Sequence, residues 1–415
     1  MTPSSRVLIV AGEASGDLYG GLLMRSMQAL AMATPDGSLA GEGSRSGVPP
    51  GEAPTQGLRF VGTGGPAMLG AGLELLGDAG SLGVTGFLEV ITKLPAIWGV
   101  FRQTCDILAS QRDPPELALL IDYPDFNLRL AKRAKRAGIP VVYFVSPQVW
   151  AWRRGRVRQI AANVDRMLVI LPFEEEFYRR SGVPVEFVGH PLVDLVRATR
   201  SREQTLAPLG LDPRRPTVAL LPGSRHNEID AHLGPMVGAA TLLREEFLDL
   251  QFLLPIAPTV DPVEMRQRLL TLGPERLGIV MLTEGRYDAL AACDAAVVAS
   301  GTATLETALL EVPMVVVYRM NPLTFMLARL ASSVPHIGMP NLIVGRRVVP
   351  ELVQGACRAE RIAAELRRIL TDPGVSGEMR SSLKEVRARL GAPGAIDKAA
   401  RASWGMIALR REATE

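Results

Sequence analysis

Two loops in the second half of the chain combine residue types that suit a diphosphate. In LLPGSR (residues 220–225), Ser224 and Arg225 can supply a hydroxyl, main-chain amides and a fixed positive charge. In AAVVASGTATLETA (residues 295–308), an apolar run ends at Ser300, and a helix is predicted to begin at the threonines that follow. The free amides and positive dipole end of a helix start attract phosphate. Each loop alone also fits an ordinary turn, but the pair favours a phosphate site.

The same helix start can hold the rest of a nucleotide. Gly301 allows a tight turn after the strand. Glu306 lies about one turn into the predicted helix, where its carboxylate can accept hydrogen bonds from both hydroxyls of a ribose. The predicted contacts with a nucleoside diphosphate are therefore Ser224, Arg225, Ser300, Gly301, Thr302, Ala303, Thr304 and Glu306. A strand, turn and capped helix without a ligand is the alternative interpretation.

Acidic side chains follow two apolar runs in the first half of the chain. In LLIDYPDFN (residues 119–127), Asp122 comes directly after a buried strand, and a carboxylate at such a position is a candidate general base. Asp125 or Asn127 is expected to cap the helix that follows. In VAGEASGD (residues 10–17), the predicted contacts with a sugar or other acceptor are Gly12, Glu13, Ser15, Gly16 and Asp17. A helix cap with an acidic first turn is the alternative for this loop.

Apolar runs that alternate with helical patterns predict an α/β fold with two doubly wound parallel sheets. Strands are predicted in the first half at 6–11, 58–61, 117–121, 141–145, 167–171 and 185–188, and in the second half at 217–221, 251–255, 279–282, 295–299 and 314–318. The pattern breaks over residues 192–216, where we place a linker. Ligands of such sheets bind beyond the carboxyl ends of the strands, so the site is expected in a cleft between the halves.

The domain prediction follows from these breaks. We predict a domain over 1–195 with a flexible, Gly-, Pro- and Ser-rich insertion at 34–57, a domain over 196–375, and a helical tail over 376–415 that packs back on the first domain. A chain of 415 residues exceeds the size of a single core, which agrees with two domains.

Composition narrows the class of protein. The net charge is +3, and the three cysteines and four histidines show no metal-ligand spacing, so we predict no metal cofactor and a reducing, cytoplasmic setting. The N-terminus lacks the pattern of a signal peptide, and no apolar stretch reaches the length of about 20 residues that spans a bilayer. Any membrane contact is therefore expected to be peripheral.

Two segments could make such a contact. Residues 81–102 are almost entirely apolar, and the predicted membrane or acyl-chain contacts are Phe87, Leu88, Ile91, Leu94 and Trp98. A cluster of arginines and lysines between Arg129 and Arg166 is opposed only by Asp165 and could face anionic lipid headgroups or nucleic acid. A core helix and a solvated basic surface are the respective alternatives.

In these motifs the chain resembles the lipid-A-disaccharide synthase family. The resemblance spans nearly the whole length, through VAGEASGD, GFLEV, IDYPDFN, YFVSPQVWAWR, LPFEEEFY, FVGHPL, LPGSR, ASGTATLE, VVYRMNPLTF and MPNLI in order. It implies a GT-B architecture of two Rossmann-like domains, with the donor in the C-terminal half and the acceptor in the N-terminal half. It matches Asp122 to the proposed base and Arg225, Glu306 and Asn341 to the UDP site, and Glu89 of GFLEV joins the predicted acceptor contacts.

The resemblance also implies a reaction. The family joins UDP-2,3-diacylglucosamine to 2,3-diacylglucosamine 1-phosphate with inversion, which gives a β-1,6-linked disaccharide and UDP without a metal. It works at the cytoplasmic face of the inner membrane of Gram-negative bacteria, and no nucleic acid partner is expected. The alternatives are another GT-B enzyme on a UDP-amino sugar, such as a UDP-N-acetylglucosamine 2-epimerase, and a membrane-binding protein with a degenerate nucleotide fold.

Overall fold

The computed structural model describes residues 5–33, 57–76, 87–150, 154–273, 277–331 and 334–412. It divides into two compact units. The N-terminal unit contains Met1–Pro191 and is completed by Pro393–Glu415, and the C-terminal unit contains Leu192–Ala392. In the described part of the chain, no helix is both long and apolar enough to cross a bilayer.

The N-terminal unit is built on a parallel sheet with the strand order β3-β2-β1-β4-β5-β6-β7. Its strands are β1 (Ser5–Ala11), β2 (Leu58–Thr63), β3 (Leu73–Leu75), β4 (Leu117–Ile121), β5 (Val141–Phe144), β6 (Arg166–Val169) and β7 (Val185–Phe187). Residues of the central strands β1, β4 and β5 are buried almost throughout, as expected for strands that are covered on both faces.

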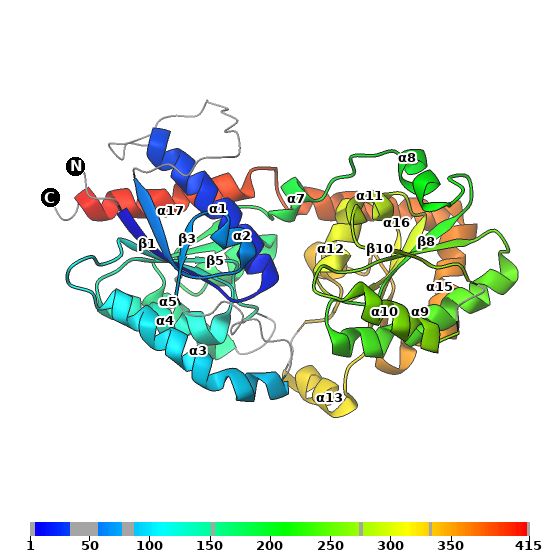
Figure 1. The fold of residues 1–415 in the computed structure, drawn as a ribbon, viewed down its shortest axis with the longest axis horizontal. Coiled ribbons are helices and arrows are strands. Elements are labelled where there is room, and N and C mark those ends of the chain that lie inside the picture. Colours follow the sequence, from blue (N-terminus) through cyan, green and yellow to red (C-terminus); the bar gives the residue numbers. More distant parts are fainter. Residues whose placement is uncertain are drawn as a thin grey trace. The chain divides into compact units, whose positions relative to one another are not determined.

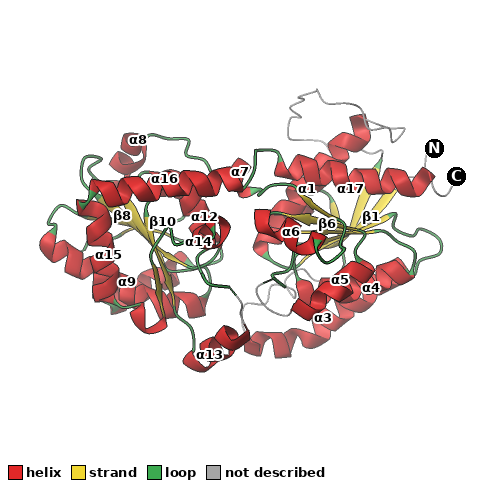
Figure 2. Ribbon diagram, turned by 180° about the vertical axis from the view of Figure 1, so that it is seen from behind, coloured by secondary structure: helices red, strands yellow, loops and turns green. Residues whose placement is uncertain are grey.

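Helices cover both faces of this sheet (Figures 1 and 2). Helices α1 (Ala14–Ala33) and α17 (Ala395–Glu412) lie side by side on one face, whereas α3 (Phe87–Leu108), α4 (Pro124–Arg136) and α5 (Val157–Asn163) cover the other. The shorter elements are α2 (Pro66–Leu69), the 3-10 turn η2 (Arg154–Arg156) and α6 (Pro172–Arg179). Because helices cover both faces of the sheet, the loops that follow the strands lie at its carboxyl edge.

The C-terminal unit repeats the plan with the strand order β10-β9-β8-β11-β12-β13. Its strands are β8 (Thr217–Leu221), β9 (Gln251–Pro255), β10 (Val280–Leu282), β11 (Ala295–Ala299), β12 (Met314–Tyr318) and β13 (Glu351–Val353). Its helical elements are α7 (Leu192–Leu195), α8 (Arg202–Leu206), η3 (Ala207–Leu209), α9 (His226–Glu246), α10 (Pro262–Thr271), α11 (Arg286–Ala291), α12 (Thr302–Leu309), α13 (Pro322–Ala331), α14 (Met339–Val344), η5 (Gln354–Ala356), α15 (Ala359–Thr371) and α16 (Pro373–Arg389).

Both sheets reverse their strand order beside their first strand. In the N-terminal unit β1 pairs with β2 on one side and β4 on the other, and in the C-terminal unit β8 pairs with β9 and β11. The loops that follow β1 and β4 therefore adjoin, as do those that follow β8 and β11. Ligands of doubly wound sheets bind at this reversal.

The predicted parallel α/β architecture is confirmed, with two strands added. Sequence patterns miss the three-residue strands β3 and β13. The compact units also divide the chain after Pro191 and after Ala392, rather than after residues 195 and 375. Helix α16 packs against α12 and α14 of the C-terminal unit, so only α17 of the predicted tail returns to the N-terminal unit.

Hydrogen bonds attach α17 to the N-terminal unit at both ends. Near its start, Ser26 of α1 donates to Asp397 over 2.7 Å. Near its end, Arg410 donates to the carbonyls of Pro115 and Glu116, both at 2.9 Å. The helix also buries Trp404 and Ile407, so the attachment is apolar as well as polar.

Candidate functional site

The strand reversal of the N-terminal unit brings Gly12 next to Asp122. Ala11 at the end of β1 pairs in register with Ile121 at the end of β4. Gly12 and Asp122 are the next residues in the chain after this pair. The amide of Asp122 donates to the carbonyl of Phe144 over 3.0 Å, so the loop begins by extending the sheet. The structure therefore places Asp122 at the position where the ligand of such a sheet binds.

The backbone at this edge is strained. Asp122 has a φ of 46° and Tyr123 a φ of 48°, and Val145, directly after the neighbouring strand β5, has a φ of 61°. Left-handed backbone is costly for residues with a Cβ and especially for a β-branched valine. Strain of this kind, about 1–3 kcal/mol per residue, persists only where the surroundings impose it, and it is concentrated at functional sites.

The Asp122 carboxyl has the properties of a general base. Burial and, to a smaller extent, the nearby Glu13 carboxylate raise the pKa of Asp122 to about 7, although a hydrogen bond from the Tyr123 amide lowers it. A carboxyl group that titrates near neutral pH can accept a proton far better than an ordinary aspartate. Glu13 itself is exposed in the loop after β1, with Ser15 partly buried in the first turn of α1.

The predicted helix caps at Asp125 and Asn127 are wrong. Helix α4 starts with Pro124 at its first position and has Tyr123 at the N-cap, without a side-chain cap. Asp125 is exposed and forms an ion pair with Arg156. Asn127 is buried and donates from Nδ2 to the carbonyls of Ile121 (3.1 Å) and Asp122 (2.8 Å). The proline supplies the helix start, which leaves both side chains for other contacts.

Asp17 contacts main-chain amides of the N-terminal unit, and its predicted contact with the acceptor stays a prediction. Its carboxylate accepts hydrogen bonds from the amides of Gly65 (2.7 Å), Ala67 (3.0 Å) and Met68 (3.0 Å), which open α2. These bonds satisfy the free amides of a helix start. Gly16 is buried in the first turn of α1, where a Cβ would lie at an ordinary contact distance of 3.4 Å from the Ala11 side chain.

The loop after β8 in the C-terminal unit presents Ser224 and Arg225 at the start of α9. Gly223 has a φ of 125°, and a Cβ there would lie 2.6 Å from the Cβ of Glu228. Glu228 accepts from the Ser224 amide at 3.0 Å and lies 3.4 Å from the Arg225 guanidinium. The Arg225 side chain is 45% exposed. Glu228 thus supports this loop, while the guanidinium group of Arg225 remains accessible to a ligand.

The loop after β11 adjoins it and opens α12. Gly301 is the N-cap of this helix, and the space around its Cα is open. Thr302 is exposed, Ala303 is partly buried, and the Ser300 hydroxyl donates to the carbonyl of Ile337 over 3.0 Å. The buried Thr304 hydroxyl donates to the Gly301 carbonyl over 2.7 Å. The main-chain amides at this helix start, rather than the side chains of Ser300 and Thr304, are therefore the groups that suit a phosphate.

Glu306 is already paired in this structure. It is 8% exposed, and its Oε1 accepts from Arg286 (2.7 Å) and from the Tyr287 hydroxyl (3.0 Å). The Arg286 guanidinium also lies over the Tyr287 ring at 4.7 Å. The predicted ribose contact therefore has two partners that sequence patterns missed, in the segment GRYD after β10.

Asn341 is fully hydrogen-bonded within the C-terminal unit. This buried side chain donates to Val349 O (2.9 Å) and Glu351 Oε1 (2.7 Å), and its Oδ1 accepts from the amides of Val348 (2.7 Å) and Val349 (2.9 Å). These four bonds use its full donor capacity and both acceptor sites. The direct contact between this side chain and UDP stays a prediction, and it would require one of these hydrogen bonds to be exchanged.

Two residues that the sequence patterns left without a role support these loops. Glu351 accepts from the amides of Ile337 (3.1 Å) and Gly338 (3.0 Å), and so holds the segment that receives the Ser300 hydroxyl. The buried His232 lies 3.1 Å from the Pro222 carbonyl and accepts from the Arg319 amide over 2.9 Å. The feature of the sequence that could have indicated this role is that His232 is a single histidine on the apolar face of a helix.

The apolar segment is helix α3, and its first part lies outside the described side chains. This applies to the predictions for Phe87, Leu88, Glu89, Ile91 and Leu94. Trp98 is 56% exposed and stacks on the buried Phe101 at 5.6 Å. In the basic cluster, Lys135 pairs with Asp165 and Arg166 with Glu186, whereas Arg129, Lys132, Arg133 and Arg136 are exposed on α4.

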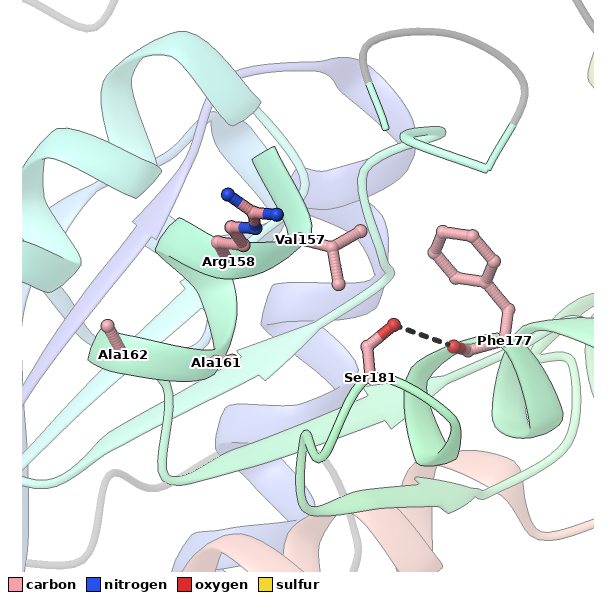
Figure 3. A pocket seen from close by; sticks show the side chains of 6 residues that line it. All are labelled: Val157, Arg158, Ala161, Ala162, Phe177 and Ser181. Carbon is pink, nitrogen blue, oxygen red and sulfur yellow. Dashed lines mark hydrogen bonds between the residues drawn. The ribbon is translucent and has the colours of Figure 1, made fainter. Parts of the chain in front are cut away.

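A shallow hollow on the N-terminal unit lies between α5 and α6 (Figure 3). It is lined by Val157, Arg158, Ala161, Ala162, Phe177 and Ser181, none of which is a predicted site residue. The Ser181 hydroxyl in it donates to the Phe177 carbonyl over 3.2 Å. Among the described residues, no three His, Cys, Asp or Glu side chains gather closely enough to hold a metal ion.

The two parallel-sheet α/β units define a protein with a GT-B-like fold. A Neisseria meningitidis UDP-GlcNAc 2-epimerase bound to UDP-GlcNAc superposes with a TM-score of 0.58 at 12% identity, covering 90% of this chain and 94% of that one. The calicheamicin glycosyltransferase CalG4 superposes with a TM-score of 0.55 at 15% identity, covering 97% of both chains. At such identities the likeness concerns the fold alone.

The sequence comparisons are more specific. The family model for lipid-A-disaccharide synthetase matches residues 7–390. The chain is 47% identical to the lipid-A-disaccharide synthase of Syntrophus aciditrophicus over 96% of both sequences. It is 43% identical to that of Geobacter metallireducens over 99% of both. The chain therefore belongs to the lipid-A-disaccharide synthetase family.

Proposed function

We propose that this chain transfers the diacylglucosamine unit of UDP-2,3-diacylglucosamine to 2,3-diacylglucosamine 1-phosphate. The products are a β-1,6-linked disaccharide 1-phosphate and UDP, in lipid A biosynthesis. The observation that carries the proposal is Asp122, a largely buried carboxyl group with a pKa raised to about 7 at the strand reversal of the N-terminal unit. Such a group can deprotonate a sugar hydroxyl near neutral pH.

The reaction is an inverting displacement. Asp122 takes the proton of the acceptor 6-hydroxyl as that oxygen forms a bond to the anomeric carbon of the donor. The bond from that carbon to the β-phosphate oxygen breaks, and its electron pair leaves with UDP. The proton remains on Asp122 until solvent removes it.

The C-terminal unit supplies the groups that suit the leaving UDP. Negative charge grows on the β-phosphate as the bond breaks, and fixed donors stabilise it electrostatically. Arg225 offers an accessible cation, and the start of α12 at Gly301 offers main-chain amides. Glu306, supported by Arg286 and Tyr287, is the group suited to the ribose hydroxyls. Asn341 is assigned to the framework of this unit.

Acyl chains of both substrates reside in a membrane, so the enzyme has to work at a lipid surface. We place it at the cytoplasmic face of the inner membrane, with α3 as the contact. The exposed Trp98 on this helix supports the assignment, because tryptophan is favoured at membrane–water interfaces. The exposed basic residues of the neighbouring α4 add attraction for anionic headgroups.

The epimerase alternative is not favoured. The likeness to epimerases is a likeness of fold at 12% identity, whereas identity to lipid-A-disaccharide synthases is 42–47% over nearly the whole chain. Incubation with UDP-2,3-diacylglucosamine separates the possibilities. The proposal requires UDP and disaccharide to appear in equal amounts, and only when the lipid acceptor is present. Conversion of the donor without acceptor would indicate an epimerase, and no conversion at all would contradict enzymatic activity on these substrates.

A further inference from the structure

The main-chain carbonyl of Asp122 is held by two side chains from other parts of the N-terminal unit. The Tyr143 hydroxyl, from the middle of β5, donates to this oxygen. Asn127 Nδ2, from the second turn of α4, donates to the same oxygen over 2.8 Å. Both side chains are fully buried. The carbonyl therefore has two donors that reach it from different elements.

The hydrogen bonds of Asn127 indicate that its side-chain amide serves to hold the main-chain carbonyl of Asp122. Besides Asp122, Nδ2 also donates to the carbonyl of Ile121 at the end of β4 over 3.1 Å. Its Oδ1 is buried and makes no hydrogen bond within the described part of the chain. A buried acceptor without a partner costs stability, about 1–3 kcal/mol. The side chain is thus used as a donor to the carbonyls at the end of β4.

These donors act where the backbone is strained. Asp122 and Tyr123 both have positive φ, which non-glycine residues adopt only when surrounding contacts enforce it. In an extended conformation the Asp122 carbonyl and side chain would point in other directions. Two donors on the carbonyl favour the left-handed conformation and so determine the direction of the carboxylate.

We propose that Asn127 and Tyr143 are positioning residues that hold Asp122 in its left-handed conformation and aim its carboxylate at the acceptor hydroxyl. They act through the Asp122 main chain and need not touch the substrate. The proposal rests on the proposed function of Asp122 as the base. It adds that the base requires a backbone clamp built from β5 and α4.

A pH profile separates positioning from mere structural support. The titratable groups around Asp122 are Glu13 after β1, Tyr123 and Asp125 after β4, and Tyr143 in β5, which is itself within electrostatic reach of Arg156. Burial is the main cause of the raised pKa of Asp122. If the clamp is lost and the carboxyl group turns toward water, its pKa falls toward the ordinary value of about 4. A loss of folding stability alone would not shift the pKa of Asp122.

The experiment measures kcat/KM against pH for Tyr143→Phe and Asn127→Ala in the full-length enzyme, with UDP-2,3-diacylglucosamine and lipid acceptor. We expect kcat to fall roughly 10-fold for Tyr143→Phe and roughly 100-fold for Asn127→Ala. In both variants the acid limb of the profile should move to lower pH. The KM for the donor should stay within about twofold, since neither residue belongs to the C-terminal unit.

Tyr178→Phe is the matched control. Tyr178 is as buried as Tyr143, and its hydroxyl pairs with Ser146 (2.7 Å) and donates to the Pro147 carbonyl (3.3 Å). It should leave the acid limb in place. A normal acid limb and kcat for Tyr143→Phe, with a lowered melting temperature only, would overturn the positioning role, even if Asp122→Asn is inactive. An active Asp122→Asn enzyme would overturn the base and the clamp together.

Discussion

A Cβ added to Gly12 would lie 2.4 Å from Cγ of Tyr123, so the absence of a side chain at Gly12 is what lets this ring lie against the loop after β1. The ring also stacks on Phe126 at 5.3 Å, which fixes it from the side of α4. Tyr123 follows the proposed base directly. Gly12 therefore has a packing role beside the site, and its predicted contact with the acceptor stays a prediction.

Replacing Gly12 with alanine should disturb this packing. Because the ring cannot retreat without moving the Asp122–Tyr123 backbone, Gly12→Ala should lower kcat by roughly 10-fold or more. It should also destabilise the N-terminal unit by about 1–3 kcal/mol, as overpacking does. Urea denaturation and steady-state kinetics measure the two effects. Gly405→Ala in α17 is the control, because an added Cβ there meets nothing within 4 Å. Wild-type kcat in Gly12→Ala would show that the ring does not position the base.

Asp122→Asn tests the base itself. The amide keeps the size of the side chain but cannot accept the proton, so the chemical rate should fall by about 10²–10⁴-fold with UDP binding nearly unchanged. In the wild type, kcat/KM should fall about tenfold per pH unit below the pKa near 7, because the base is then protonated. Asp125→Asn, which removes the exposed carboxylate that pairs with Arg156, should stay within about 1 kcal/mol in stability and remain active. If Asp125→Asn is the inactive variant instead, the roles are exchanged.

The same substitution has a consequence for stability. The folded-state pKa of Asp122, about 7, lies above the value of an unfolded chain. The native state therefore binds the proton more tightly, and the contribution of this group to stability falls as the pH rises from about 4 to 7. Asp122→Asn should thus be more stable than the wild type at pH 8, by roughly 1–3 kcal/mol, and similar at pH 4. Equal melting temperatures at pH 8 would contradict a raised pKa.

Arg225→Ala tests the donor loop. The residue is a half-exposed loop side chain, so the fold should be unaffected, but the leaving phosphate loses its cation. We expect a fall in rate of about 10²-fold or more. The control is Arg214→Ala, which removes an arginine that is 90% exposed in the same unit and should leave the rate unchanged. Activity of Arg225→Ala within a few-fold of the wild type would contradict the assignment.

Asn341→Ala should behave as a framework mutation. It leaves Glu351 and three main-chain groups without their buried partner, which should cost about 2–4 kcal/mol of stability. At a temperature where the variant is fully folded, its Kd for UDP should lie within a few-fold of the wild type. Titration calorimetry after a thermal scan measures both. Normal stability with lost UDP binding would restore a direct ligand contact.

Membrane contact is tested at Trp98. Trp98→Ser should lower the fraction of enzyme bound to vesicles that contain anionic phospholipid, because an interfacial anchor is lost. Leu248→Ser is the control, since Leu248 is 80% exposed and lies in the C-terminal unit outside the proposed contact. Co-sedimentation with vesicles measures the bound fraction. An unchanged fraction for Trp98→Ser would contradict the role of α3.

Much of the architecture could be predicted from local patterns. Runs of buried valine, leucine and isoleucine mark the central strands, because a parallel strand covered on both faces must be apolar along its length. Because the direction of the chain is known, the loops at the carboxyl ends of these strands could be identified as well. Asp122 and Arg225 could therefore be placed at strand ends as soon as the strands were recognised.

Local patterns predict which polar residues lie at the strand ends, but the partner of each side chain depends on residues that are distant in the chain. A carboxylate or amide next to a loop can accept from a ligand or from main-chain amides, and local sequence does not distinguish the two. Asp17 binds the amides of Gly65 and Met68 because β1 and β2 pair. Asn341 is saturated by Val349 and Glu351 in the same way. The raised pKa of Asp122 likewise depends on burial and on Glu13, which the pairing of β1 with β4 brings beside it. Long-range strand pairing thus sets which donors and charges each of these side chains meets.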